Sequence, residues 1–284
     1  MKKIVIAGGD KRMSCLAELL FNSGYSFASY AVNGGLTKDE FLCYLRENNN
    51  ILLILPLPVS RDKIHLNTGK AFEDVRLSEI GECLGKSDTV AGGIIGDSRT
   101  VLSANGTKVY DYYDEKFITD NARLTAQCLK FVLNENGIYD FSGKKTAITG
   151  YGRTAKAIAE FMKENGAKVL ITARDPHALA DAVKKGYSIC LLRDYDCIAH
   201  DADILINTVP AEIIDKNILS RLRKDVLLID IASPPFGVDI GLADSYGINA
   251  VRALGLPGKY APEEAGRLIF KKAQPLLCKE GKMC

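Results

Sequence analysis

The sequence has no apolar run long enough to span a membrane. A membrane-spanning helix needs about 18 consecutive apolar residues, and no segment of the chain approaches that length. The short apolar run at the N-terminus is interrupted by Gly8, Gly9 and Asp10, so we interpret it as a first β-strand and not as a signal peptide. We therefore expect no membrane partner.

An excess of charge of one sign is also missing. The 37 Lys and Arg residues against 35 Asp and Glu residues leave a net charge of +2, which lacks the basic footprint of a nucleic-acid-binding protein. The apolar fraction of 47% and the length of 284 residues are typical of a globular protein with two domains.

Closely spaced metal ligands are absent as well. The three histidines lie far apart and the eight cysteines form no C-x-x-C pair, so we predict no metal site. Most of the cysteines lie in apolar segments, a pattern typical of buried, reduced thiols in a cytoplasmic protein.

What the sequence does contain is a strand–turn–helix–strand pattern over residues 145–174. It consists of the apolar strand Lys145–Thr149, the G-x-G-x-x-A turn Gly150–Ala155, a helix with one apolar face that ends before Gly166, and the strand Lys168–Ala173. In this context the glycine turn predicts dinucleotide binding, whereas an isolated glycine turn would not.

The physical basis of this prediction lies in the turn. Gly150 permits a tight bend, Gly152 lets the backbone approach a pyrophosphate, and Ala155 lets the helix pack closely on the sheet. The unpaired N–H groups of the first helical turn then face the anion. We predict cofactor contacts from the turn residues Gly150, Tyr151, Gly152, Arg153 and Thr154.

The end of the second strand favours NADP over NAD. An NAD site usually has an acidic residue there to bind the ribose 2′-OH, but this strand ends in Ala173 and Arg174. A guanidinium at this point suits a 2′-phosphate. Asp175 precedes Pro176 and is expected to cap the next helix. The alternative is that Arg174 is an ordinary surface arginine.

Three later strands are predicted at 203–207, 226–231 and 249–253. In open parallel sheets, ligands bind beyond the carboxyl ends of the strands. We therefore predict further cofactor contacts from the residues that end or follow these strands: Asn207, Thr208, Val209, Pro210, Ala232 and Leu256. The alternative for each residue is simple turn formation.

Substrate-binding residues are predicted from similar positions and from cationic side chains. An arginine in the first turn of a helix suits a carboxylate. The candidates are Gly9, Arg12, Asn121, Thr125, Ser233 and Lys259, with Arg61 as a further cation.

No histidine has the sequence context of a catalytic base. His65 lies in an irregular segment, His177 follows the predicted helix cap, and His200 precedes a strand, so we expect all three to be structural or exposed. We also identify no His–carboxylate couple. If proton transfer is needed, Asp10, Lys259 or water remain as candidates.

The pattern of strands and helices predicts the fold class α/β, with two α/β domains. Residues 1–118 form an N-terminal domain for substrate or partner binding, and residues 119–136 form a connecting helix that Asp120 caps. Residues 119–261 form a doubly wound, parallel-sheet Rossmann domain. A final helix opens at Pro262, and residues 262–284 are expected to pack back on the first domain.

Several of these segments together resemble the family of the A subunit of dipicolinate synthase. They are Gly8-Gly9-Asp10-x-Arg12, Asn121-Ala-x-x-Thr125, Gly150-x-Gly152-Arg153-Thr154, Ala173-Arg174, Ile206–Pro210, Leu228–Ser233, Ala253–Lys259 and Ala261–Gly266. The similarity extends over nearly the whole chain, and residues 60–117 differ most.

The resemblance implies an NADP-dependent oxidoreductase that acts on a cyclic dicarboxylate. It would aromatise dihydrodipicolinate, derived from 4-hydroxytetrahydrodipicolinate at a branch of the lysine pathway, to pyridine-2,6-dicarboxylate during sporulation. It also implies a partner, the B subunit of dipicolinate synthase, and a place in the mother-cell cytoplasm; a homo-oligomer is expected too. The alternatives are an NADP-dependent dehydrogenase of the shikimate or 2-hydroxy acid type, and a non-catalytic cofactor-binding scaffold.

Overall fold

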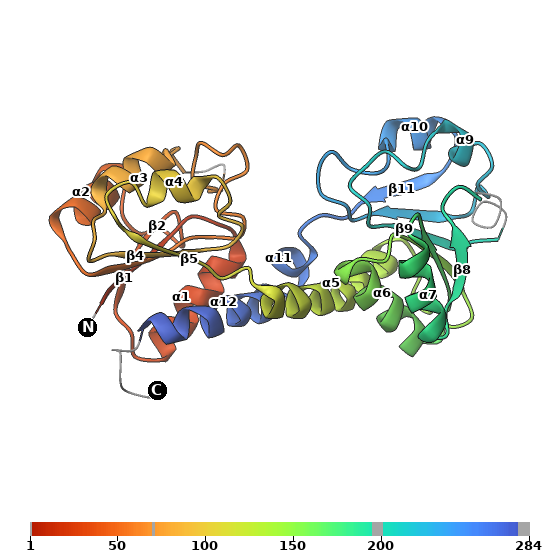
Figure 1. Ribbon diagram of the computed structural model, residues 1–284, viewed down its shortest axis with the longest axis horizontal. Helices are drawn as coiled ribbons and strands as arrows, with labels where there is room; N and C mark the ends of the chain where they lie inside the picture. The colour runs from red at the N-terminus through yellow and green to blue at the C-terminus, as the bar shows by residue number, and fades with distance from the viewer. Residues whose placement is uncertain (1, 70–71, 195–200, 278–284) are drawn as a thin grey trace. The chain divides into compact units, whose positions relative to one another are not determined.

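The computed structural model describes residues 2–69, 72–194 and 201–277 and divides into two compact units (Figure 1). The first unit is the chain up to Asn121 together with the chain from Ala261 onward, and the second is Ala122–Tyr260. Each unit is built around one all-parallel sheet. The predicted fold class, two α/β domains, is confirmed.

The first sheet has five parallel strands in the spatial order β2-β1-β3-β4-β5. The strands are β1 (Lys3–Ala7), β2 (Phe27–Tyr30), β3 (Ile51–Ile54), β4 (Thr89–Gly92) and β5 (Lys108–Asp111). The central strands β1 and β3 are almost continuously apolar and buried, because helices cover both faces of the sheet. The strand order reverses between β1 and β3, which makes their carboxyl ends a topological switch point.

Helices pack on both faces of this sheet (Figure 1). Those of the first unit are α1 (Lys11–Asn22), α2 (Lys38–Glu47), α3 (Leu77–Cys83), α4 (Ser98–Leu102) and α12 (Pro262–Leu277). One apolar cluster joins the sheet to α2, α3 and α4, and another joins it to α1 and α12. At the start of α2, Thr37 and Glu40 form a capping box.

Helix α12 lies against α1, and the contact depends on a glycine. A Cβ atom at Gly266 would lie 2.9 Å from the carbonyl oxygen of Arg12 and 3.0 Å from the Cβ of Cys15. An ion pair between Lys272 and Asp114 adds a polar contact in the same unit. The return of the chain to the first unit therefore requires a residue without a side chain at position 266.

The second sheet has six parallel strands in the order β11-β10-β9-β6-β7-β8. The strands are β6 (Lys145–Thr149), β7 (Lys168–Ala173), β8 (Ser188–Leu191), β9 (Ile204–Asn207), β10 (Leu227–Asp230) and β11 (Asn249–Arg252). This is the strand order of a complete dinucleotide-binding fold, with its switch point between β6 and β9. The predicted Rossmann topology is confirmed.

The helices of this sheet are of very different lengths. They are α5 (Glu115–Glu135), α6 (Arg153–Glu164), α7 (Pro176–Lys184), α9 (Lys216–Leu219), α10 (Ile240–Ser245) and α11 (Leu256–Tyr260). Figure 1 shows α6 on one side of the sheet and α9 and α10 on the other. Helix α5 crosses the division between the two units.

Some sequence-based expectations are wrong. Asp120 does not cap the connecting helix, because α5 begins at Glu115 and the Asp114 carboxylate accepts the N–H of Phe117 at 2.9 Å. Two short helices were not predicted from the sequence: α3 lies between β3 and β4, and α11 follows β11. Helices of one or two turns carry too few residues for an apolar periodicity to be visible.

The cysteines also differ from expectation. Cys190 is disulfide-bonded, so the prediction of reduced thiols is wrong there. Cys128 is a buried free thiol as predicted, whereas Cys43 is an exposed one. Within the described parts of the chain, no helix has the length and apolar character to cross a membrane.

The contact between α12 and α1 leads to a stability prediction. Gly266→Leu should destabilise the protein by about 2 kcal/mol, because the new side chain meets backbone atoms of α1 that cannot move aside. Urea denaturation followed by circular dichroism measures the change. Arg267→Leu, at the next and exposed position, is the control and should change stability by no more than about 0.5 kcal/mol. Equal stability of the two variants would contradict the proposed close approach.

Candidate functional site

The glycine turn after β6 packs against the loop that follows β9. Gly150 has a φ of +87°, and a Cβ atom there would lie 2.7 Å from Oγ1 of Thr208 and 2.9 Å from Cγ2 of Val209. Its N–H donates to the carbonyl oxygen of Thr172 at 2.7 Å. The turn is thus fixed at the switch point of the second sheet, and only glycine fits at position 150.

The next glycine opens α6 and leaves its N-terminus accessible. Gly152 is the N-cap residue, no side chain caps the helix, and a Cβ atom at Gly152 would have no atom within 4 Å. The apolar face predicted for this helix, with Ala155 and Ile158, is buried as expected. Helix N-termini without an internal cap attract anions through their N–H groups and the helix dipole. The residues present therefore fit a pyrophosphate.

The corresponding turn in the first unit is already occupied by a side chain. Asp10 caps α1 by accepting the N–H of Arg12, and the Arg12 guanidinium donates twice to the same carboxylate at 2.8 Å. Arg12 also donates to the carbonyl oxygen of Leu57 at 2.6 Å. An internal carboxylate thus takes the place of an external anion, and of these two turns only the one at Gly152 is open.

At the end of β7 the structure has the arrangement predicted from the sequence. Ala173 is buried and ends the strand, and Arg174 is exposed directly after it. The Asp175 carboxylate accepts the N–H of His177 at 2.9 Å and caps α7, with Pro176 in the first turn. The tip of β7 therefore presents a cation, and the adjacent carboxylate is engaged as a helix cap.

Asn207 occupies a different position from that of a ligand donor. Its side chain is fully buried at the end of β9, where Oδ1 accepts the Thr149 hydroxyl at 2.5 Å and Nδ2 donates to Asp230 at 2.8 Å. The same amide also bonds to both backbone groups of Val209. The polar atoms of Asn207 thus bind the protein itself.

The other residues predicted to contact the cofactor follow the carboxyl ends of β9, β10 and β11. Thr208 is half-buried and its hydroxyl donates to the carbonyl oxygen of Thr149 at 2.7 Å. Pro210 and Ser233 are exposed, whereas Ala232 and Leu256 are buried. These positions lie at the edge of the sheet that the glycine turn also occupies.

Lys259 belongs to a cluster that ties α11 to the end of α5. Its ammonium group lies 2.5 Å from the Tyr260 hydroxyl and 3.3 Å from the Glu135 carboxylate, and Tyr260 donates to the same carboxylate at 2.6 Å. The Tyr260 ring also stacks on Phe131, with centroids 5.1 Å apart. The bond with Tyr260, reinforced by Glu135, raises the pKa of Lys259.

These surroundings disfavour the two candidates for proton transfer. Burial raises the pKa of the Asp10 carboxyl, but the hydrogen bonds and charge of Arg12 outweigh it and the net pKa lies below its usual value. A carboxylate of lowered pKa is a weak base, and an ammonium of raised pKa is a weak acid. Asp10 and Lys259 therefore suit electrostatic roles better than proton transfer.

Of the remaining substrate candidates, Gly9 follows β1 in the β1–α1 turn, and Asn121 and Thr125 lie one turn apart on α5.

The structure forms a His–carboxylate couple that the sequence did not reveal. Nδ1 of His65 lies 2.7 Å from Oδ2 of Asp62, in the loop after β3. The N–H of His65, and then its ring, hold the pKa of Asp62 well below its usual range. The D-x-x-H spacing of Asp62 and His65 was the signal in the sequence that could have revealed this couple.

Of the other two histidines, His177 is exposed and His200 lies outside the described residues. Among the described residues, no group of three metal-binding side chains is found.

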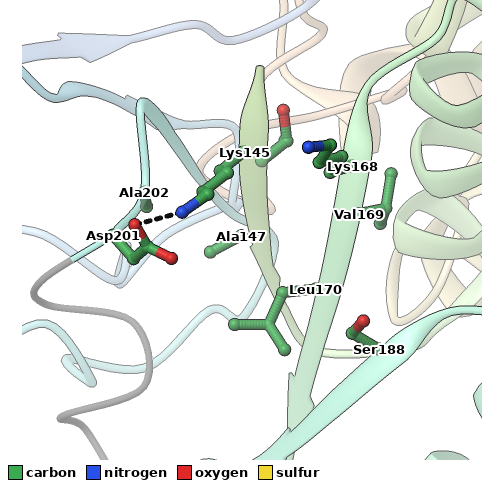
Figure 2. A pocket seen from close by; sticks show the side chains of 9 residues that line it. Lys145, Ala147, Lys168, Val169, Leu170, Ser188, Asp201 and Ala202 are labelled. Carbon is green, nitrogen blue, oxygen red and sulfur yellow. Dashed lines mark hydrogen bonds and ion pairs between the residues drawn. The ribbon is translucent and has the colours of Figure 1, made fainter. Parts of the chain in front are cut away.

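A cavity of about 260 Å³ lies at the other end of the second sheet (Figure 2). It is lined by Lys145, Lys168 and Ser188, the first residues of β6, β7 and β8. The dashed line in Figure 2 marks the ion pair between Lys145 and Asp201. These are the amino ends of the strands, opposite to the edge where parallel sheets bind ligands.

Comparison with known protein families gives a match for each domain. Residues 3–113 match the N-terminal domain of the A subunit of dipicolinate synthase, and residues 132–269 match the NAD binding domain of S-adenosyl-L-homocysteine hydrolase. The A subunit of dipicolinate synthase from Bacillus subtilis (strain 168) is 35% identical over 139 residues, which are 49% of this chain and 47% of that protein. The chain thus spans about half the length of this curated relative.

Solved structures share the fold over almost the whole chain. The A chain of dipicolinate synthase from Bacillus subtilis has a TM-score of 0.79 at 24% identity, covering 97% of this chain and 95% of that one. The A subunit of dipicolinate synthase from Bacillus halodurans has a TM-score of 0.82 at 23% identity, covering 98% of each chain. D-lactate dehydrogenase from Escherichia coli, at 13% identity and a TM-score of 0.62 over 97% and 96% of the chains, shares the same architecture.

The Asp10–Arg12 pair leads to a pH-dependent prediction. Asp10→Ala should lower stability at pH 7 by about 1 kcal/mol through loss of the helix cap. The folded-state pKa lies below the ordinary value of 3.8. The carboxylate therefore stabilises fully above that value, and its contribution disappears as the pH falls through the folded-state pKa.

The measurement is urea denaturation of both proteins from pH 7 down to about pH 3. The gap between wild type and Asp10→Ala should narrow below about pH 4. Asp244→Ala, an exposed acid late in α10, is the control and should show no such gap. A gap that stays constant with pH would mean that the charge of Asp10 does not stabilise α1.

Proposed function

Because this chain is a homologue of the A subunit of dipicolinate synthase, we propose that it is an NADP-dependent oxidoreductase that converts dihydrodipicolinate to pyridine-2,6-dicarboxylate. The open glycine turn at the switch point of a Rossmann-like domain is the observation that carries the cofactor part of this proposal. The similarity to dipicolinate synthase carries the substrate part.

The cofactor is proposed to bind through the backbone of the turn between β6 and α6. Gly150 holds the turn against the β9 loop, and Gly152 leaves room for the pyrophosphate beside the first N–H groups of α6. Tyr151, Arg153 and Thr154 belong to the same turn. The adenosine end would follow β7 towards Arg174, and the nicotinamide end would follow the strand ends of β9 and β10.

NADP is proposed over NAD because of the tip of β7. Arg174 follows the strand directly and is exposed, while the Asp175 carboxylate is engaged in capping α7. A guanidinium binds a phosphate through charge and paired N–H donors, whereas an NAD site would require a free carboxylate for the 2′-OH.

The proposed reaction removes a hydride and a proton from the dihydropyridine ring. A nicotinamide cofactor, when bound, would accept the hydride, and aromatisation would provide the driving force. The chain's own task is to hold a dianion in place. Lys259 stays protonated, and Arg12 keeps the N–H groups of Nη1 beyond those bound to Asp10 and Leu57. Each of these cations, taken in its own unit, suits a carboxylate. Water is proposed as the proton acceptor.

The setting is proposed from the same homology. The B subunit of dipicolinate synthase would be the partner, the protein would form an oligomer, and the reaction would take place in the mother-cell cytoplasm during sporulation.

The direct test supplies the protein with 4-hydroxytetrahydrodipicolinate and NADP, with and without this partner. Dipicolinate absorbance appearing together with NADPH is the expected result. If neither dipicolinate nor NADPH appears, with or without the partner, the proposal is refuted. NADP binding without turnover would favour a scaffold.

Gly152 allows cofactor binding to be separated from folding. Gly152→Ala should leave the melting temperature of the cofactor-free protein within about 2 °C, because no protein atom lies near the added methyl group. The dissociation constant for NADP should rise about tenfold or more, because the methyl group occupies the space for the pyrophosphate. Isothermal titration calorimetry measures it. Unchanged affinity would place the cofactor elsewhere.

Arg174 distinguishes the two nicotinamide cofactors. Arg174→Asp should weaken NADP binding by about tenfold to a hundredfold, through loss of charge-assisted bonds, and affect NAD far less. Lys168→Ser, at the opposite end of the same strand, is the matched control and should change neither affinity. Equal losses for NADP and NAD would mean that Arg174 does not bind the 2′-phosphate.

A further inference from the structure

We infer that Asn207, Asp230 and Arg252 are positioning residues, which set the two loops that would line the nicotinamide end of the dinucleotide site. The identity of the ligand rests on the proposed function. The role of these three residues in fixing the two loops rests on the geometry of the second unit. The two loops are residues 208–211 after β9 and residues 231–238 after β10.

The network links four neighbouring strands at their carboxyl ends. Thr149 ends β6, Asn207 ends β9, Asp230 ends β10 and Arg252 ends β11. The first three side chains are at most 1% exposed. The Thr149 hydroxyl donates to Asn207 at 2.5 Å, and Asn207 donates to Asp230 at 2.8 Å. Parallel pairing brings these ends side by side, in the strand order β11-β10-β9-β6.

Asn207 fixes the first loop directly. Its Oδ1 accepts the N–H of Val209 at 3.2 Å, and its Nδ2 donates to the carbonyl oxygen of Val209 at 3.0 Å. One side chain thus satisfies both backbone groups of the same residue. The chain at Val209 is held in one conformation, next to Gly150 in the glycine turn.

Asp230 fixes the second loop at two points. Oδ1 accepts the N–H of Ala232 at 3.2 Å, and Oδ2 accepts the N–H of Gly237 at 3.3 Å. A Cβ atom at Gly237 would lie 2.0 Å from Nδ2 of Asn207, so the second loop packs directly on the amide that holds the first. The two loops are therefore linked through the side chain of Asn207, which the first loop hydrogen-bonds and the second loop contacts.

Arg252 holds the second loop from its other side. Nη2 donates to the carbonyl oxygen of Val238 at 2.5 Å and lies 3.8 Å from Oδ2 of Asp230. The guanidinium also stacks on Phe236, 3.8 Å from the ring centroid. Phe236 has a φ of +72°, a conformation unfavourable for a residue with a large side chain. Its surroundings must hold it there.

Apolar packing holds this loop at its two ends, where Ala232 and Val238 are buried, but not along the exposed residues between them. A cavity of about 540 Å³ opens beside it, lined by residues including Glu212, Phe236, Asp239 and Arg252. A loop bordered by open space on one side depends on the polar contacts on the other. Between these two buried ends, the loop that would meet the nicotinamide ring is set by buried hydrogen bonds.

The test compares the whole cofactor with its adenosine half. Adenosine 2′,5′-bisphosphate would reach only the glycine turn and Arg174, whereas NADP also reaches the two loops. In Asp230→Asn the amide group turns an N–H towards one of the backbone donors and leaves Arg252 without its counter-charge. The dissociation constant for NADP should rise about tenfold or more, and that for the bisphosphate by less than about twofold.

Hydrogen exchange of the cofactor-free protein supplies a readout independent of the ligand. The amides of Val209, Ala232 and Gly237 should exchange faster in Asp230→Asn than in wild type. The control is Asp225→Asn, the same change at an exposed residue paired with Arg223. If Asp230→Asn does not fold, Thr149→Val removes one hydroxyl and should give a smaller effect, which Thr149→Ser restores.

The outcomes separate the two proposals. Unchanged exchange of both loops in Asp230→Asn and in Thr149→Val would overturn the positioning role, and so would equal losses for NADP and the bisphosphate. A wild-type protein that binds neither compound would refute the proposed function, whereas the exchange experiment would still decide whether the network fixes the loops.

Discussion

The second domain depends on the packing of Gly150 against the loop after β9. The turn can lie at the switch point only because residue 150 has a left-handed backbone and no side chain between Thr208 and Val209. From there the chain enters α6 at Gly152, with an N-terminus that no side chain caps. The capacity to bind an anion is thus a property of the backbone, and side chains serve mainly to fix its position.

The first domain shows how small a change closes such a site. It also begins with a buried strand, a glycine turn and a helix, but Asp10 caps the helix and Arg12 neutralises the carboxylate. The internal carboxylate satisfies the same N–H groups that a phosphate would otherwise bind. The two glycine turns therefore differ in one respect: a side chain caps the helix that follows the first turn, and no side chain caps the helix that follows the second.

The sequence predicted best what is decided locally. The bounds of β6 and β7, the start of α12 and the cap at Asp175 all follow from residues that lie close together in the sequence. The role of Asn207 was missed because its partner Asp230 is 23 residues away. Only the register of β9 and β10 brings the two together, and strand register is set by tertiary packing.

Asp230 also shows why a buried charge is useful in this position. Transferring a carboxylate out of water costs several kcal/mol, which a single partner rarely restores. Here Asn207, two backbone N–H groups and the nearby Arg252 share the compensation. An apolar residue would avoid the desolvation but leave these donors unpaired in the interior. The carboxylate is therefore better understood as the group that determines the loop geometry than as a source of stability.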